Sequence, residues 1–335
     1  MINNKLILVI LAILVGAGAL IFFVTPPFNK SPEAKLRRVS ILVASDLQLA
    51  GVEGVKAGLK ELGYKEESDI AYELFNPKGD RELTKKMAEE IVSKKPDLII
   101  ALSTSASRAV KDANQDAKIS VVAVDVGNFA ELGIENIQRP GGFITGVVVD
   151  NVPAGAKRME ILKELLPNLK TIALLVNNKH VSYDEILKTH EAGAKKLGIK
   201  LIWYPVTTKE EVPPAMEKLV KAKPGAFMTT SEAVISGNAD LIAPVLKKAK
   251  IPSIDFNVER GVKAGYLTVY GIPRFDTGKQ SARTIDKVLK GQNPGDIPVE
   301  FASTITFEIN NVLALDMGLK VPDSLLLRAN RVYNE

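Results

Sequence analysis

The chain of 335 residues contains no cysteine, only two histidines and a single tryptophan. Without cysteine the protein forms no disulfide bond and no thiolate metal site, and it lacks the lipidated cysteine that anchors many exported bacterial proteins. His180 and His190 are ten residues apart, a spacing that does not place both on one face of a helix. We therefore expect no metal and no other cofactor, and we interpret both histidines as structural or surface residues.

Catalytic signatures are also missing. The sequence has no G-x-S-x-G element, no phosphate-binding loop, and no G-x-G-x-x-G after an expected strand. Gly51, Gly54 and Gly58 have the wrong spacing for a nucleotide loop, so we interpret them as packing glycines. An enzyme of the doubly wound class was considered, but it would need an activated nucleophile or a metal, and neither is visible. We predict a protein that is not an enzyme.

The positive charge is thinly spread. Net charge is +5, yet the basic clusters are short, as at residues 35–38 and 247–248. We expect them on solvated helix surfaces. A nucleic-acid interface would need a concentrated basic stripe interleaved with aromatic residues, and aromatics make up only 6% of the chain. We therefore expect no nucleic-acid partner.

One long apolar run lies near the N-terminus. Leu6–Val24 are 19 consecutive residues without a polar or charged side chain, about 28 Å as a helix, which is close to the thickness of a bilayer core. The run is longer than most signal-peptide cores, so an uncleaved membrane anchor is expected, with a cleaved signal as the alternative. Because more basic residues follow the run than precede it, the positive-inside rule alone would place the body in the cytoplasm.

The body alternates between short apolar runs and amphipathic stretches. Residues 39–44 and 98–102 are typical of strands buried on both faces. Apolar residues at helical spacing separate such runs. This alternation predicts an α/β fold with right-handed crossovers and parallel sheets.

Residues 121–149 form a seam between two such runs. The segment is expected to contain a strand, a polar loop, a tight turn at residues 139–142, and a second strand. The alternating pattern restarts after it, which predicts two Rossmann-like lobes with a ligand cleft beside the seam. A helix over residues 275–289 and a strand near 305–307 suggest that the chain crosses back, and three connections would make a hinge.

Ligands of open α/β sheets bind at the carboxyl ends of the strands. We therefore took the polar and aromatic residues that follow each expected strand as candidates. The candidate ligand-binding residues are Ser45, Asp46, Ser103, Thr104, Ser105, Asp125, Gly127, Asn128, Asn177, Ser231, Asp255 and Tyr270.

Residues 103–107 are the strongest of these candidate segments, because hydroxyls and free N–H groups at a helix start can hold a carboxylate. Simple helix capping is the alternative. Asp46 and Asp125 could pair with an ammonium group or form turns. Phe129 and Tyr270 could stack on an aromatic ligand or pack in the core or hinge, as could Phe256.

Several segments of the C-terminal half resemble one family. Residues 139–147, RPGGFITGV, resemble the RPGGNVTGV segment of the ABC-transporter substrate-binding family that includes tryptophan- and tyrosine-binding proteins. Residues 157–167, KRMEILKELLP, are similar to its KRLELLKELLP helix. Residues 289–300 and 315–326 resemble its ILKGxxPxDLPVE and closing ALGLxIPxSLLxRA segments. Residues 127–129 depart from the Asp-Pro-Val of many relatives.

The resemblance covers residues 38–335 and implies a type I periplasmic-binding-protein fold. It implies a small ligand, an amino acid with aromatic ones as first candidates, and an ABC permease with its ATPase as partner. It also implies an extracytoplasmic body, anchored to the membrane through residues 6–24 or released after signal cleavage, which is why the charge rule is set aside.

From these observations we predict an anchor or signal segment at residues 1–30. Lobe 1 is expected to comprise residues 38–148 and 271–298, and lobe 2 residues 149–270 and 299–335. The predicted function is the solute-binding component of an ABC importer. A membrane-anchored, ligand-sensing ectodomain without a transport role is the alternative, and a cytoplasmic body is a further one.

Overall fold

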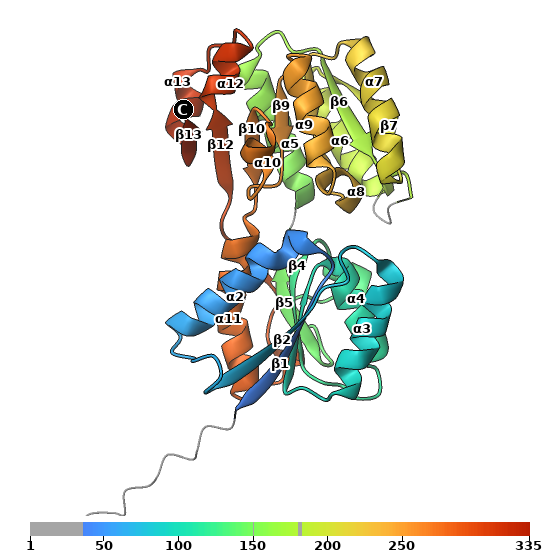
Figure 1. Ribbon diagram of the computed structural model, residues 1–335, viewed down its shortest axis with the longest axis vertical. Coiled ribbons are helices and arrows are strands. Elements are labelled where there is room, and N and C mark those ends of the chain that lie inside the picture. Colours follow the sequence, from blue (N-terminus) through green and yellow to red (C-terminus); the bar gives the residue numbers. More distant parts are fainter. Residues whose placement is uncertain (1–35, 150, 180–182) are drawn as a thin grey trace, which may run out of the picture.

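The computed structural model describes residues 36–149, 151–179 and 183–335. Within them the chain forms two α/β lobes arranged end to end (Figure 1). This confirms the predicted two-lobe fold. The expected membrane segment at residues 6–24 lies outside the described residues. In the described ranges, no helix has the length and apolar character needed to cross a bilayer.

Lobe 1 is built on a six-stranded sheet with the order β11-β5-β4-β3-β1-β2, in which all pairs are parallel. Alternate strand residues point to opposite faces, so Ile41 joins the core under α2 and α11 while Leu42 joins the core under α3 and α4. The elements are β1 (Arg37–Val43), η1 (Asp46–Gln48), α2 (Leu49–Glu61), β2 (Ile70–Phe75), α3 (Arg81–Ser93), β3 (Leu98–Leu102), α4 (Thr104–Ala113), β4 (Val121–Val126), η2 (Phe129–Leu132), β5 (Ile144–Val148), α11 (Arg274–Leu289), η4 (Pro294–Asp296) and β11 (Glu300–Phe301).

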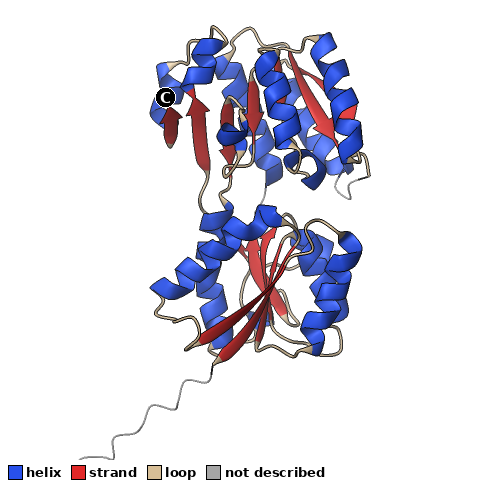
Figure 2. Ribbon diagram, viewed as in Figure 1, coloured by secondary structure: helices blue, strands red, loops and turns tan. Residues whose placement is uncertain are grey.

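Lobe 2 is built on a seven-stranded sheet with the order β13-β12-β10-β9-β8-β6-β7. Helices cover both faces of each sheet (Figure 2). The elements are α5 (Asn151–Leu165), β6 (Thr171–Val176), α6 (Tyr183–Leu197), β7 (Lys200–Pro205), η3 (Lys209–Glu211), α7 (Val212–Ala222), β8 (Ala226–Met228), α8 (Ala233–Ser236), α9 (Ala239–Lys248), β9 (Ser253–Asp255), α10 (Gly261–Ala264), β10 (Thr268–Gly271), β12 (Thr306–Asn310), α12 (Asn311–Asp316), α13 (Asp323–Arg328) and β13 (Arg331–Tyr333).

The chain passes between the lobes three times, between β5 and α5, between β10 and α11, and between β11 and β12. Two details differ from expectation. Glu300 and Phe301 pair with β5 of lobe 1, so the last connection follows residue 301 and not residue 298. Because the chain re-enters lobe 2 there, β12 runs antiparallel to β10, and the second sheet is not purely parallel.

Local sequence signals explain several helix ends. The Asp80 side chain accepts a hydrogen bond from the Leu83 backbone N–H at 3.0 Å and caps α3, as predicted. Pro213 and Pro214 lie in the first turn of α7, where their missing N–H groups cost nothing. Ser103 caps α4 by accepting from the Ala106 N–H at 3.2 Å. These N-terminal signals fix where the strand-to-helix loops end and the helices begin.

Glycines let α2 and α11 pack with their backbones in close approach. A Cβ on Gly54 would lie 2.0 Å from the carbonyl oxygen of Phe275, and a Cβ on Gly278 would lie 2.0 Å from that of Gly51. The interpretation of Gly51, Gly54 and Gly58 as packing residues is therefore confirmed. This contact holds the first residues of α11 in place at the hinge.

We expect the Gly278→Ala variant to lose about 2 kcal/mol of unfolding free energy, because the added methyl group meets backbone atoms that cannot rotate away. Urea denaturation measures this change. Gly193→Ala in α6 is the matched control, since the closest contact of its methyl group, at 2.8 Å, would be with the flexible end of Met159, and its backbone contact with Ala156 would be an ordinary 3.6 Å. Equal stability of the two variants would contradict the proposed backbone contact.

Candidate functional site

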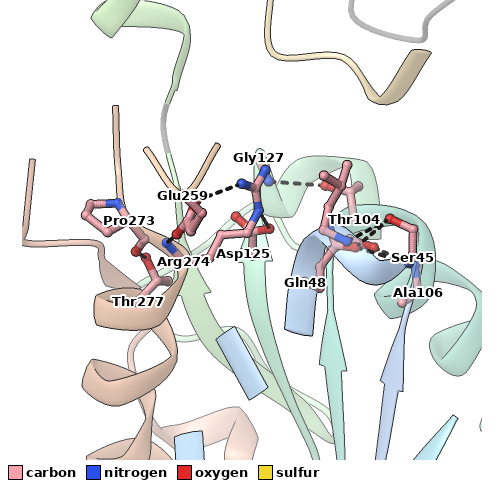
Figure 3. A network of polar contacts seen from close by, with 12 residues as sticks. Ser45, Gln48, Thr104, Ala106, Asp125, Gly127, Glu259, Pro273, Arg274 and Thr277 are labelled. Carbon is pink, nitrogen blue, oxygen red and sulfur yellow. Dashed lines mark hydrogen bonds and ion pairs between the residues drawn. The ribbon is translucent and has the colours of Figure 1, made fainter. Parts of the chain in front are cut away.

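Several of the predicted residues lie together at the edge of lobe 1 that faces lobe 2. Figure 3 shows Thr104, Asp125 and Gly127 there. The Gly127 N–H donates to Thr104 Oγ1 at 3.1 Å, which joins the end of β4 to the start of α4. Ser103 Oγ lies 3.2 Å from Ser105 Oγ. Because parallel strands place their carboxyl ends at the same edge of a sheet, the residues that follow β3 and β4 lie side by side here. The first turn of α4 therefore presents hydroxyl groups beside β4.

Two residues on this edge have strained backbones. Ser103 follows β3 with φ 109° and ψ 158°, a region that only glycine normally occupies. Asp125, near the end of the adjacent β4, has φ 57°. Such conformations cost about 1–3 kcal/mol each and cluster at ligand sites. Their occurrence on neighbouring strands makes this edge the candidate ligand site.

An ion-pair cluster links the lobes next to these residues. Arg274, the first residue of α11, donates from Nε to Asp125 Oδ2 at 3.2 Å and from Nη1 to Glu259 Oε2 at 3.3 Å. The Arg274 backbone N–H also donates to Glu259 Oε1. Asp125 belongs to lobe 1 and Glu259 to the loop after β9 in lobe 2. Glu259 thus caps a lobe-1 helix from the opposite lobe (Figure 3).

Burial changes the ionisation of this cluster. Burial lowers the pKa of Arg274, but the carboxylates of Asp125 and Glu259 outweigh that effect and raise it. Arg274 therefore stays charged. Burial also raises the pKa of Asp125, while Arg274 acts in the opposite direction. The Asp125 carboxylate is poorly solvated, and a cation placed beside it would be held strongly.

The other candidates in lobe 1 are held by local contacts. Asp46 is exposed and accepts from Asn76 Nδ2 at 2.7 Å. Asn128 is exposed and caps η2 by accepting from the Ala130 N–H at 2.9 Å. The Ser45 hydroxyl lies 3.2 Å from Gln48 Oε1, within a capping box. Of the two acidic candidates in lobe 1, the structure brings Asp125 into a charged cluster and joins Asp46 to a neutral amide.

In lobe 2 the predicted edge is organised by Glu232. Its carboxylate accepts from the Asn177 N–H at 2.8 Å and from Thr230 Oγ1 at 2.9 Å, which ties the ends of β6 and β8 together. The side chain is only 1% exposed, and burial raises the pKa of Glu232 to about 7. Ser231 beside it is exposed. Glu232 was not among the candidates, although it follows the same strand as Ser231.

Asp255 is turned inward. Its carboxylate is 2% exposed and accepts from Thr229 Oγ1 at 2.6 Å. Burial raises the pKa of Asp255, and Arg158 on α5 opposes that shift. The guanidinium of Arg158 lies 5.9 Å from the ring centre of Phe256. Asp255 and Arg158 are thus both buried in lobe 2, and their opposite charges attract each other.

The aromatic candidates lie elsewhere. Phe129 is 1% exposed in the lobe-1 core, so the stacking prediction is wrong for this ring and the core alternative is confirmed. Tyr270 packs edge-on against Phe307 at 6.3 Å. It lines a cavity of about 240 Å³ formed with Lys157, Ile161, Ile305, Phe307, Arg328 and Asn330. Tyr270 therefore contributes to the hinge side of lobe 2 and not to the lobe-1 cluster.

Sequence reasoning missed Arg274 and Glu259. The rule for parallel sheets points to residues directly after strands. Arg274 instead begins a helix after the second connection between the lobes, and Glu259 lies four residues beyond β9. A usable signal was present. Arg274 follows Pro273 at the start of a helix whose N-terminus has no side-chain cap of its own.

The structure offers no metal site among the residues it describes, since no group of three or more histidine, aspartate or glutamate side chains could hold an ion there. His190 is buried, and desolvation lowers its pKa to about 4. It is therefore neutral at physiological pH and acts in packing. The interpretation of His190 as a structural residue agrees with this, and His180 lies outside the described residues.

Comparisons with known proteins identify the family. The family model described as ABC transporter substrate binding protein matches residues 38–333. A tyrosine-binding protein of Clostridioides difficile (strain R20291) is 28% identical over 302 residues, which cover 89% of this chain and 86% of that protein.

Two solved structures share the fold. An ABC domain in complex with L-Trp from Streptococcus pneumonia has a TM-score of 0.81 and 24% identity, covering 89% of this chain and 99% of that one. A ligand-free, open substrate-binding protein with adhesive properties from Clostridium difficile has a TM-score of 0.68 and 23% identity, covering 90% and 100%. With two lobes, three connections and a family match over nearly all the described residues, the chain belongs to the ABC transporter substrate-binding protein family.

Proposed function

We propose that this protein is the extracytoplasmic solute-binding component of an ABC importer and that it binds an amino acid between its lobes. The observation that carries the proposal is the strained polar edge of lobe 1. There Ser103 and Asp125 hold unfavourable backbone conformations beside the start of α4. Strain of this kind persists where a fold positions groups for a ligand.

The edge offers complementary groups for a zwitterion. The N-terminus of α4 and the hydroxyls of Thr104 and Ser105 suit a carboxylate. Asp125 suits an ammonium group, because its carboxylate is poorly solvated and shares the guanidinium of Arg274 with Glu259. A relative that binds tyrosine and a similar structure that holds L-Trp make aromatic amino acids the first candidates.

Hinge closure would complete the site. The connections between the lobes are the three short segments described above, and Asn177, Ser231 and Glu232 lie at the lobe-2 edge. A ligand that contacts both edges favours the closed arrangement, since only a difference in affinity between two states shifts their populations. The partner would be an ABC permease with its ATPase, reached from a membrane anchor at residues 6–24.

Titration calorimetry of the purified protein with each of the twenty amino acids tests the proposal. We expect saturable binding of L-tyrosine or L-tryptophan and a smaller radius of gyration in solution scattering when the ligand is present. Absence of binding by every amino acid, together with unchanged scattering, would overturn both the ligand class and the closure mechanism.

A further inference from the structure

Arg274 occupies the place where the hinge meets the candidate site. It is the first residue of α11 and follows directly on the connection from lobe 2. Its side chain is only 11% exposed. Figure 3 shows the guanidinium between Asp125 and Glu259, at the lobe-1 edge. A charge in this position acts on any ligand bound beside Asp125.

The cluster carries more negative than positive charge. Two carboxylates, from Asp125 and Glu259, share one guanidinium. When all three are ionised the net charge is one negative unit. Each side chain is at least three-quarters shielded from solvent, with exposed fractions of 13%, 24% and 11%. Such charges interact more strongly than they would in water.

The geometry shows that Arg274 is shared between its partners. Its two contacts of 3.2 Å and 3.3 Å are longer than the roughly 2.7–2.9 Å of a strong charge-assisted hydrogen bond. Neither carboxylate receives the paired N–H contacts that a guanidinium can give. The guanidinium therefore balances one unit of the charge, while the second remains available to a cation.

We propose that Arg274 is a specificity-determining residue: by compensating one of the two carboxylates, it lowers the repulsion of a ligand carboxylate and so lets the site select a zwitterionic amino acid over an amine that lacks the carboxylate. This inference rests on the proposed amino-acid site. Without Arg274 two carboxylates would repel the ligand's own carboxylate while attracting its ammonium. Specificity for the amino acid therefore depends on avoiding repulsion of the ligand carboxylate as well as on attracting the ligand ammonium.

The test compares L-tyrosine with tyramine, the same molecule without its carboxylate. If calorimetry selects tryptophan, the pair is L-tryptophan and tryptamine. We expect the wild-type protein to prefer the amino acid. In Arg274→Gln the ratio of the two affinities should shift by about tenfold or more toward the amine. Arg274→Lys, which keeps the charge, should retain most of the wild-type ratio.

A charge-compensated double variant separates selectivity from folding. Arg274→Gln combined with Glu259→Gln again leaves one carboxylate without a counter-charge, so its affinity ratio should return toward the wild-type value. Arg81→Gln is the matched control, because Arg81 is likewise the first residue of a lobe-1 helix, α3, but is exposed. Its ratio should not change.

The outcomes distinguish the two proposals. If the wild-type protein binds neither compound of either pair, the amino-acid function itself fails. If it binds the amino acid but Arg274→Gln leaves the ratio unchanged, or the double variant does not restore it, only the role of Arg274 is overturned. Thermal unfolding of each variant shows whether a lost affinity reflects a lost fold.

Discussion

The Asp125→Asn variant should bind its amino-acid ligand about 100-fold more weakly than the wild-type protein, because removing one member of a buried charge pair typically costs about 2–5 kcal/mol. Asparagine has the same shape as aspartate and tolerates the positive φ of 57° at this position, so the backbone should be preserved. The loss would therefore come from the missing charge. Titration calorimetry measures the change.

Two further variants serve as a comparison and a control for Asp125→Asn. Asp46→Asn tests the other acidic candidate, which is exposed and bonded to Asn76, and we expect a much smaller loss. Asp240→Asn removes an exposed partner of Arg260 and should leave binding unchanged. If Asp46→Asn were the more damaging variant, the ammonium site would have to be moved from Asp125 to Asp46.

The Glu232→Gln variant should change how stability depends on pH. The pKa of Glu232 is raised by burial from 4.5 to about 7, so between these values the folded protein holds a proton that the unfolded chain releases. The contribution of protonated Glu232 to the stability of the folded protein is fully present below pH 4.5 and is lost as pH rises through about 7. A shift of this size corresponds to about 3 kcal/mol, and the neutral glutamine should remove the loss.

Urea denaturation of both proteins at several pH values from 5 to 8 checks this expectation. The variant should gain stability relative to the wild type as pH rises, approaching about 3 kcal/mol at the alkaline end. Other titrating groups cancel in the difference. Glu217→Gln, on the exposed face of α7, is the control and should track the wild type. Parallel curves for Glu232→Gln and the wild type would show that this carboxyl group does not titrate in the window.

The lobes and most of their elements could be predicted because periodicity is a local property. The apolar run at β3 and the helical spacing in α2 are visible in a few residues, and so are caps such as Asp80. The edge at Ser103 and Asp125 followed from the rule for parallel strands. The short strand β11 was not predicted, since two residues carry no period and their partner β5 is about 150 residues away.

The Asp125–Arg274–Glu259 cluster could not be predicted for a related reason. Its members come from a strand end, a helix start and a loop in two different lobes, and they meet only once the three connections are in place. The burial of Phe129 was equally hidden, because a phenylalanine after a strand looks the same in sequence whether it faces the core or the solvent. The direction in which a side chain points at the end of a strand depends on tertiary contacts, which the local sequence does not reveal.

The connectivity of lobe 1 also constrains how the protein is made. Residues Arg274–Leu289 and Glu300–Phe301 complete a lobe that begins at Arg37, and α11 packs against α2 through glycine contacts. During synthesis from the N-terminus, residues 37–148 therefore lack a helix and an edge strand of their own lobe until residue 301 has been made. Because lobe 2 is inserted between these parts, lobe 1 stays incompletely folded while that insertion is translated.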